Sequence, residues 1–360
     1  MASYRYHLIQ VIGEGSFGVV YKAIDNHTGQ FVAIKQLKQK SDPKANQMDS
    51  MEVRALSILQ HPNIVRLQGG WHQGKTDFLV FEYMQGSLGD LIHQRLSMGV
   101  PFSEAEIRSL MIQVLGGLEF MHHKHGFMHR DLKPANLLMN KGVIKISDLG
   151  TATEIGSLQA FHHYVTTRSY RAPEMLLGVF KKTQKGQPFV YDEKVDMWAV
   201  GAIMAELYLM RPLFRGHTSP HQLHEICKVI GAPTWGSWMA GMLATKCMIM
   251  PNKVLEPQYG RGFRALMPYA SQSAINLIES LCSWNPARRP SAAQALQHPF
   301  FKRVQKLEAP PGFSNCTHRR NSVVPKLEAP PGFPNCTHRR NTAVPKMTYL
   351  STMQHPVLGL

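Results

Sequence analysis

The feature that most constrains this chain is the run HRDLKPAN at positions 129–136, which the triplet Asp148-Leu149-Gly150 follows after an apolar, strand-like segment. The run brings a carboxylate, an amine and an amide close together in sequence, and Asp148 adds a second carboxylate. So many polar groups at fixed spacings do not arise by chance. We therefore expect the run and the triplet to serve one site.

The chemistry that these side chains suit is the transfer of a phosphoryl group, which needs mainly positioning and neutralisation of charge. Asp131 can orient an acceptor hydroxyl and take its proton, and Lys133 can neutralise the phosphoryl oxygens. Asn136 offers a carbonyl oxygen and Asp148 a carboxylate, which are the hard oxygen ligands that Mg²⁺ prefers. We predict that Asp131 and Lys133 are catalytic and that Asn136 and Asp148 bind the metal.

A glycine-rich turn near the N-terminus is consistent with this chemistry. Residues 13–20, GEGSFGVV, fit the pattern G-x-G-x-x-G-x-V, and glycine lets a backbone approach phosphates closely. Dinucleotide sites use similar glycines, but there the turn opens a helix, whereas strand-like residues flank this turn on both sides. The Gly-Lys-Ser/Thr of a Walker-type loop does not follow the turn.

A lysine inside an apolar strand is the next candidate. Lys35 ends the segment VAIK, and burying an unpaired amine costs free energy. Glu52, on the helix expected over 51–59, is available as its partner and would hold it against the phosphates. The alternative is a surface lysine whose amine reaches water along its own aliphatic stem.

The order of the predicted elements indicates two lobes. Strand-like segments dominate up to about residue 84, with one helix among them, and longer helical patterns follow. We expect an α+β fold with a small β-rich N-lobe at 1–84, which carries one key helix, and a larger, mainly α-helical C-lobe at 85–301. The strands are expected at 6–12, 19–23, 31–37, 64–67, 78–83 and 143–146, and the later helices at 104–122, 195–209, 223–230, 271–284 and 291–297.

The remaining segment, 302–360, has a different composition. KLEAPPGFSNCTHRRNSVVP at 306–325 recurs as KLEAPPGFPNCTHRRNTAVP at 326–345, and each copy contains Pro-Pro-Gly and no apolar periodicity. We expect a flexible basic tail with a 20-residue direct repeat. Ser322 and Thr342, each preceded by Arg-Arg-Asn, resemble sites for a basic-directed kinase, and a solvated linker is the alternative.

Composition limits the classes of partner and compartment. The formal charge is +16, which suits acidic partners without choosing among them. Five cysteines, an odd number without a C-x-x-C pair, argue against a disulfide framework. The N-terminus shows no secretory signal and no segment is apolar enough to span a bilayer, so we expect a cytoplasmic and/or nuclear protein without a membrane partner.

These motifs resemble those of the eukaryotic protein kinase family over about residues 4–301. Further similarity lies in Ala172-Pro173-Glu174, in DMWAVG at 196–201, and in Arg289, which resembles the buried partner of Glu174. The resemblance implies ATP and Mg²⁺ as cofactors and proteins as substrates. It implies that adenine lies between Val20, Ala33 and Leu138, with Phe81 as gatekeeper and Glu82 and Met84 in the hinge. The complete expected ATP site is Ile12, Gly13, Glu14, Gly15, Ser16, Phe17, Gly18, Val20, Ala33, Lys35, Phe81, Glu82, Met84 and Leu138.

Within that family the chain is similar to the CMGC group of cyclin-dependent and MAP-kinase-like enzymes. TTRSYRAPE at 166–174 resembles the group's T-R-W-Y-R-A-P-E, and LCSWNP at 281–286 resembles the MAK/ICK/MOK-like subfamily. The resemblance implies serine/threonine specificity, with proline or a small residue after the acceptor. Because the helix with Glu52 lacks a PSTAIRE-like run, no classical cyclin is expected.

The activation segment departs from the subfamily pattern. The expected threonine is replaced by His162, and Ser169 stands where tryptophan is expected. We expect Tyr164 to be phosphorylated instead, by the protein itself or by an upstream kinase. The regulatory residues implied by the resemblance are therefore Arg130, which would otherwise hold a threonine phosphate, Tyr164, Thr167, which would bind Asp131 and Lys133, and Arg171.

Two other classes of function compete with a kinase. A catalytically inactive pseudokinase or scaffold is disfavoured, because such proteins usually lose Lys35, Asp131 or Asp148, and all three are present. A nucleic-acid-binding protein acting through its basic tail is also disfavoured, because the tail's aromatic residues are scattered singly.

Overall fold

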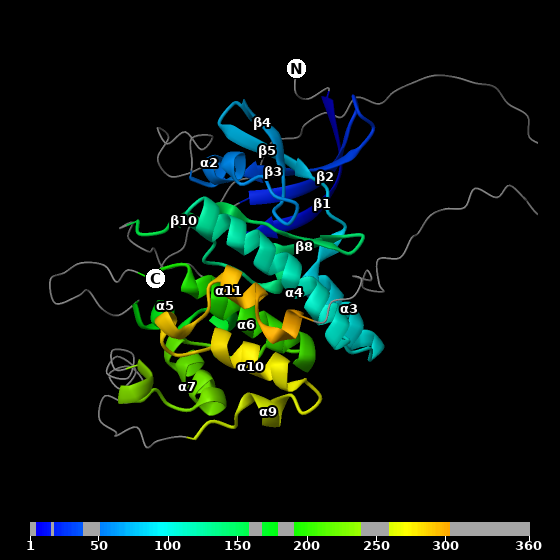
Figure 1. Cartoon of the computed structure of the whole chain (residues 1–360). Helices are drawn as coiled ribbons and strands as arrows, with labels where there is room; N and C mark the ends of the chain where they lie inside the picture. Colours follow the sequence, from blue (N-terminus) through cyan, green and yellow to red (C-terminus); the bar gives the residue numbers. More distant parts are fainter. Residues whose placement is uncertain are drawn as a thin grey trace, which may run out of the picture. The chain divides into compact units, whose positions relative to one another are not determined.

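The computed structural model describes residues 5–15, 18–38, 51–157, 168–178, 191–238 and 259–302. All of them belong to the first of the chain's two units, Met1–Ser314. Figure 1 shows a β-sheet with one adjoining helix, followed along the chain by a larger set of helices. The two-lobe α+β architecture expected from the sequence is confirmed.

The first lobe is built on a five-stranded antiparallel sheet with the strand order β1-β2-β3-β5-β4. Helix α2 (Met51–Ile58) connects β3 to β4, and its Ala55 and Leu56 are buried in one core with Leu79 of β5. The strands are β1 Tyr6–Gly15, β2 Gly18–Asp25, β3 Phe31–Leu37, β4 Leu67–Gln73 and β5 Thr76–Glu82.

The strand predicted at 64–67 is placed wrongly. Ile64 makes a single parallel bridge with Ile146, and the true strand, β4, begins at Leu67 and continues through Gly69 and Gly70. β4 is an edge strand whose side chains are largely exposed, so its sequence lacks the apolar residues on which the prediction relied.

The second lobe is mainly helical and contains two small sheets. β6 pairs with β8 and β8 with β9, while β7 pairs with β10. Its strands are β6 Gly86–Ser87, β7 Phe127–Met128, β8 Leu137–Asn140, β9 Val143–Ile146 and β10 Thr153–Glu154. Its helices are α3 Leu88–Met98, α4 Glu104–Glu119, α5 Pro173–Gly178, α6 Lys194–Leu209, α7 Ser219–Ile230, α9 Phe263–Leu266, α10 Gln272–Leu281 and α11 Ala292–Leu296, with short 3-10 turns η3 Pro134–Asn136, η4 Leu149–Thr151, η5 Arg168–Tyr170, η6 Pro286–Arg288 and η7 Pro299–Phe301.

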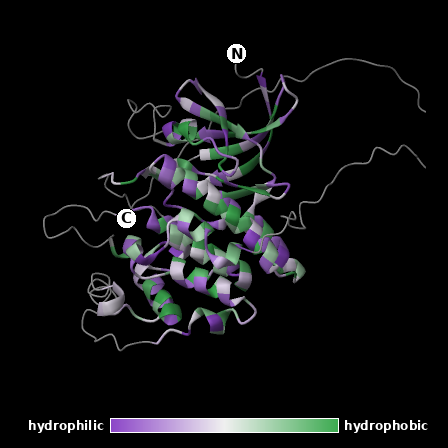
Figure 2. Ribbon diagram, viewed as in Figure 1, coloured by the Kyte–Doolittle hydropathy of each residue, from purple (hydrophilic) through white to green (hydrophobic). Residues whose placement is uncertain are grey.

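Helix α6 forms the centre of this lobe. Every residue from Val195 to Leu207 is buried, and Figure 2 shows stretches of apolar, green ribbon among the helices of this lobe. Such all-round apolarity is typical of a helix enclosed by others. In the part of the chain that the structure describes, no helix has the length and apolarity needed to span a bilayer.

Helix α4 begins as predicted but ends differently. Ser103 caps it through a reciprocal pair of hydrogen bonds with Glu106. The α-helix stops at Glu119, and a π-helical turn, η2 (Phe120–Lys124), continues to the segment before β7. A π turn accommodates more residues than an α turn, and this one places His122 beside Asp196 of α6.

Candidate active site

A cavity of about 790 Å³ is lined by residues of both lobes. Ser16 and Phe17 of the expected ATP site lie outside the described residues. The other twelve expected ATP-site residues line the cavity: Ile12, Gly13, Glu14, Gly15, Gly18, Val20, Ala33, Lys35, Phe81, Glu82, Met84 and Leu138. Glu52, Lys133, Asn136 and Asp148 line it as well.

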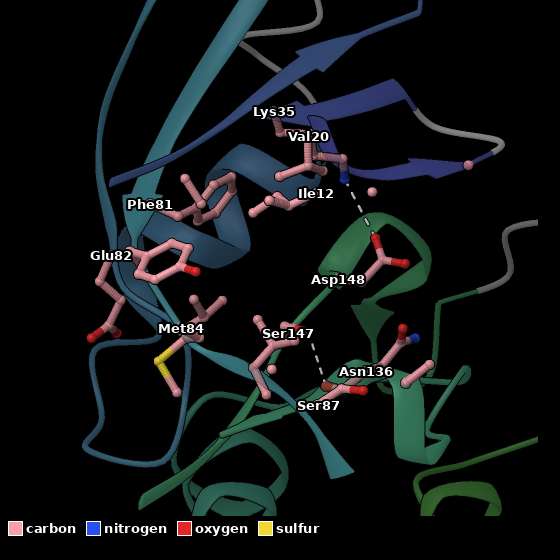
Figure 3. Close-up of a pocket in the computed structure, with 18 of the residues that line it drawn as sticks. Ile12, Val20, Lys35, Phe81, Glu82, Met84, Ser87, Asn136, Ser147 and Asp148 are labelled. Atoms are coloured by element: carbon pink, nitrogen blue, oxygen red, sulfur yellow. Dashed lines mark hydrogen bonds and ion pairs between the residues drawn. The ribbon is translucent and has the colours of Figure 1, made fainter. Parts of the chain in front are cut away.

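Lys35 is paired on both sides of its amine. Its Nζ lies 2.6 Å from Glu52 Oε1 and 3.4 Å from Asp148 Oδ1, and Figure 3 shows it extending from β3 toward Asp148. Burial opposes the charge of Lys35, but the two carboxylates outweigh it and raise the pKa of the amine. The lysine is therefore a buried cation at the cavity and not a surface lysine.

The run HRDLKPAN at 129–136 forms a compact set of hydrogen bonds around Asp131. Lys133 Nζ lies 2.8 Å from Asp131 Oδ2. Asn136 Nδ2 donates to the Asp131 backbone oxygen at 2.8 Å and to Oδ2 at 3.3 Å. Because these bonds use the amide nitrogen of Asn136, its carbonyl oxygen is the end that remains for a ligand.

Asp196 holds the backbone of this run in place. Its carboxylate accepts hydrogen bonds from the backbone N–H of His129 at 2.7 Å and of Arg130 at 2.8 Å, and its Oδ2 lies 2.9 Å from His122 Nε2. Burial works against its charge, but the contact with His122 and the backbone donors lower the pKa of Asp196. These contacts support the left-handed conformation of Arg130, whose φ is 72°.

His129 connects the run at 129–136 to the triplet Asp148-Leu149-Gly150. Asp131 N–H donates to His129 Nδ1 at 3.2 Å, so the ring's proton is on Nε2, which donates to the Ser147 backbone oxygen at 2.8 Å. Ser147 directly precedes Asp148, so the His129 imidazole links the backbone at Asp131 to the backbone next to Asp148.

The oxygen atoms of Asn136 and Asp148 suit Mg²⁺ as ligands. Asn136 and Asp148 present oxygen atoms to the same cavity, as Figure 3 shows. Within the described residues, no group of three or more His, Cys, Asp or Glu side chains could hold a metal by itself. Mg²⁺ commonly binds through one or two protein ligands and completes its shell with phosphate and water, which agrees with this arrangement.

The four expected regulatory residues divide into two pairs. Tyr164 and Thr167 lie outside the described residues. Arg130 Nε donates to the Thr151 backbone oxygen at 2.5 Å, and Arg130, Asp131 and Arg171 line one small cavity. Burial, and then the nearby Arg168, lower the pKa of Arg171.

The cavity wall also includes residues that the sequence did not single out. Ser87 and Asp90 at the start of α3 and Ser147 before Asp148 are among them. Ser87 and Asp90 form a capping box, and the spacing Ser-x-x-Asp was a detectable signal for the start of that helix. The position of Ser147 depends on tertiary contacts and had no such signal.

Comparison with known proteins agrees with this geometry. The sequence-family model of the protein kinase domain matches residues 6–301. Cyclin-dependent kinase F-3 of Oryza sativa subsp. japonica is 43% identical over 297 residues, which cover 82% of this chain and 65% of that protein. Human serine/threonine-protein kinase MAK is 39% identical over 304 residues, which cover 84% of this chain and 46% of the relative. Rat serine/threonine-protein kinase ICK is 40% identical over 299 residues, covering 83% of this chain and 45% of the relative.

The match therefore spans between about half and two thirds of the length of these relatives. The family match itself includes the cavity, the run at 129–136 and the helices that support them. The chain belongs to the protein kinase family and, within it, to the CMGC group that contains the cyclin-dependent kinases and the MAK and ICK kinases.

Proposed function

We propose that the protein is a serine/threonine protein kinase that transfers the γ-phosphoryl group of ATP to protein substrates. One observation carries the proposal. Lys35 and Asp148 line the same cavity as Lys133 and Asn136, and the last two both bond Asp131. Nucleotide-binding, metal-binding and proton-accepting groups therefore converge at one place.

Each residue has a role that follows from its position. Lys35, held by Glu52, binds the non-transferred phosphates, and Lys133 neutralises charge on the transferred group. Asp131 orients the acceptor hydroxyl and takes its proton. Asn136 and Asp148 would hold Mg²⁺, which when bound neutralises charge on the phosphates and orients them.

The assignment is tested by labelling a generic protein substrate with Mg-ATP, using wild type, Asp131→Asn and Asp192→Asn. Asp192 is an exposed acid that accepts a hydrogen bond from the Lys194 backbone, so it is a matched control. We expect Asp131→Asn to lose a factor of about 10²–10⁴ in rate and Asp192→Asn to keep wild-type activity. Equal labelling by wild type and Asp131→Asn would refute the assignment. Nucleotide binding without turnover by wild type would instead identify a scaffold.

The acceptor is proposed to be serine or threonine, followed by proline or a small residue. Serine or threonine as the acceptor is supported by the names of the relatives and by Lys133, which stands two residues after Asp131. The preference for proline or a small residue after the acceptor is supported by Arg171, which lies in the run that resembles the CMGC substrate loop. A peptide library that varies the residue after the acceptor tests it, and equal rates with proline, alanine and leucine would contradict the preference.

No classical cyclin is proposed as a required partner. The chain by itself makes the Lys35–Glu52 pair, and Arg54 Nη2 of the same helix lies 3.1 Å from Glu154 Oε1 of β10. These contacts hold α2 at the cavity from within the chain. Activity of the purified protein without added partners is expected, and activity that appears only after a cyclin is added would contradict the proposal.

Regulation is proposed to act through Tyr164, with Arg171 as the partner of its phosphate. The replacement of the expected threonine by His162 motivates this proposal. Mass spectrometry of active protein that shows unmodified Tyr164 would exclude it.

A further inference from the structure

Lys145 lies close to the nucleotide cavity but does not line it, and it has no part in the chemistry proposed above. It is on β9, pairs in register with Leu138 of the cavity wall, and precedes Asp148 on the same stretch of chain. Its Nζ lies 2.7 Å from Glu82 Oε1, and the two side chains are 17% and 25% exposed. The pair is therefore largely shielded from solvent.

Glu82 is the last residue of β5, where the chain leaves the N-lobe sheet for the hinge. Glu82 lines the cavity together with Phe81 and Met84, but its carboxylate points away from the cavity in Figure 3. Besides Lys145, Oε1 accepts the backbone N–H of Arg66 at 2.7 Å, and Glu82 N–H donates to the Arg66 oxygen at 3.2 Å. One carboxylate oxygen thus joins three segments.

The segment that contains Arg66 is itself fixed to the C-lobe. Val65 N–H donates to the Ile146 oxygen at 2.9 Å, and Ile146 N–H donates to the Asn63 oxygen at 2.8 Å. The Asn63 side chain also donates to the Ile144 oxygen at 2.9 Å. Both groups that bind the Glu82 carboxylate are therefore attached to β9, so the carboxylate fastens the hinge to the C-lobe sheet.

Exposed ion pairs contribute little to the stability of a fold, because water and salt screen the charges and the paired side chains lose conformational freedom. The Glu82–Lys145 pair differs in being shielded and in sharing its acceptor oxygen with a fixed backbone donor. Such charge-assisted hydrogen bonds are stronger and geometrically defined. Opening of the lobes about the hinge would have to stretch or break this contact.

We propose that Lys145 is a positioning residue that fastens the hinge through Glu82, limits opening of the lobes and so slows nucleotide exchange. This inference rests on the proposed function, because it assumes that the cavity binds ATP and ADP. It assigns Lys145 no contact with substrate.

The experiment measures dissociation of a fluorescent ADP from the full-length protein, with ATP and peptide kinetics in parallel. Lys145→Gln removes the charge, Lys145→Arg keeps it, and Lys141→Gln changes an exposed lysine in the same β8–β9 hairpin. We expect ADP to leave Lys145→Gln about tenfold faster, and an acceleration below about twofold overturns the inference. Lys145→Arg and Lys141→Gln should both resemble wild type.

Comparison of KM and kcat in the Lys145→Gln variant separates a positioning role of Lys145 from a purely structural one. In Lys145→Gln the KM for ATP should rise while the KM for peptide stays constant and kcat does not fall, because Asp131 and Lys133 are untouched. A lower Tm with unchanged ADP dissociation would show that Lys145 only stabilises the fold. Adding Glu82→Gln to Lys145→Gln should cause no further acceleration, because both changes break one contact, and additive effects would contradict the proposal.

The outcomes also distinguish this inference from the function on which it rests. A wild-type protein that binds no ADP would overturn both. Unaltered ADP dissociation in a Lys145→Gln protein that binds ADP and phosphorylates peptide would overturn the inference alone.

Discussion

Gly18 is the residue where backbone geometry most restricts the glycine-rich turn at 13–20. Its φ is +152°, and a Cβ at this position would lie 2.0 Å from the Gln36 backbone oxygen of β3. Neither the dihedral nor the contact can relax without moving the strand. Gly15 is its register partner across the β1–β2 hairpin, and a Cβ at Gly15 would meet no described atom within 4 Å.

The two glycines therefore predict opposite outcomes for the same substitution. Gly18→Ala should lower the free energy of unfolding by roughly 2–4 kcal/mol through strain and overlap. Gly15→Ala should change it by less than about 1 kcal/mol. Thermal denaturation of both variants checks this, and similar losses in the two would contradict the steric account.

His72 predicts a pH dependence in the β4–β5 hairpin. Its Nδ1 lies 2.7 Å from Asp77 Oδ1, and this hydrogen bond raises the pKa of the imidazole. A raised pKa means that the folded state favours the protonated ring. The contact therefore stabilises the folded state fully below the ordinary histidine pKa of about 6.5. This stabilisation disappears as the pH rises through the raised pKa of His72.

The measurement is the Tm of wild type and His72→Gln as a function of pH. The difference between the two should be largest in mildly acidic buffer and shrink toward alkaline pH. A difference that stays constant across neutrality would show that the contact is not linked to protonation of His72.

At this scale the sequence predicted which side chains lie together at the cavity better than it predicted the residues that hold them in place. Lys35, Asp131, Asn136 and Asp148 are recognisable because their side chains occur at spacings that the chemistry requires. Asp196 was noticed only as part of a family motif, since its bonds to His122 and to two backbone N–H groups depend on tertiary packing.

At the scale of elements, the spacing of apolar residues predicted most of the helices and the buried strands. Helix α4 begins at Glu104 because Ser103 and Glu106 form a capping box. Its π-helical end had no signal that we recognised in the sequence, and the bond of His122 in that turn to the distant Asp196 of α6 depends on tertiary packing. Helix α3 was missed because only Leu88, Leu91 and Ile92 of its four buried positions are apolar, and the fourth is the charged Arg95.

The cap of α4 can be tested directly. Ser103→Ala removes the acceptor for Glu106 N–H and the donor to its carboxylate, so the free energy of unfolding should fall by about 1 kcal/mol. Ser97→Ala is the control, because Ser97 lies near the end of α3 and its hydroxyl donates to the Gln94 oxygen. Urea denaturation measures both, and an equal loss in the two variants would exclude a capping effect.

At the scale of the whole described unit, one ion pair joins helix α5 to the C-terminal end of the second lobe. Arg289 binds both carboxylate oxygens of Glu174, at 2.5 and 2.8 Å, and the two side chains are 0% and 2% exposed. The contact between them was expected from the sequence by resemblance and is confirmed. Arg289 also donates to the backbone oxygens of Ser283, at 2.9 Å, and of Lys194, at 3.0 Å.

Breaking this pair should be far more costly than breaking an exposed one. Arg289→Gln leaves the Glu174 carboxylate buried and unpaired, so the free energy of unfolding should fall by about 3–5 kcal/mol. Arg54→Gln removes the exposed partner of Glu154, whose side chain is 45% exposed, and should cost less than about 1 kcal/mol.

Replacing both partners, with Glu174→Leu and Arg289→Met, removes the buried charge but leaves the Ser283 and Lys194 oxygens without their donor. Urea denaturation should therefore place the double variant between wild type and Arg289→Gln. A double variant less stable than Arg289→Gln would show that the loss comes from packing and not from the uncompensated carboxylate.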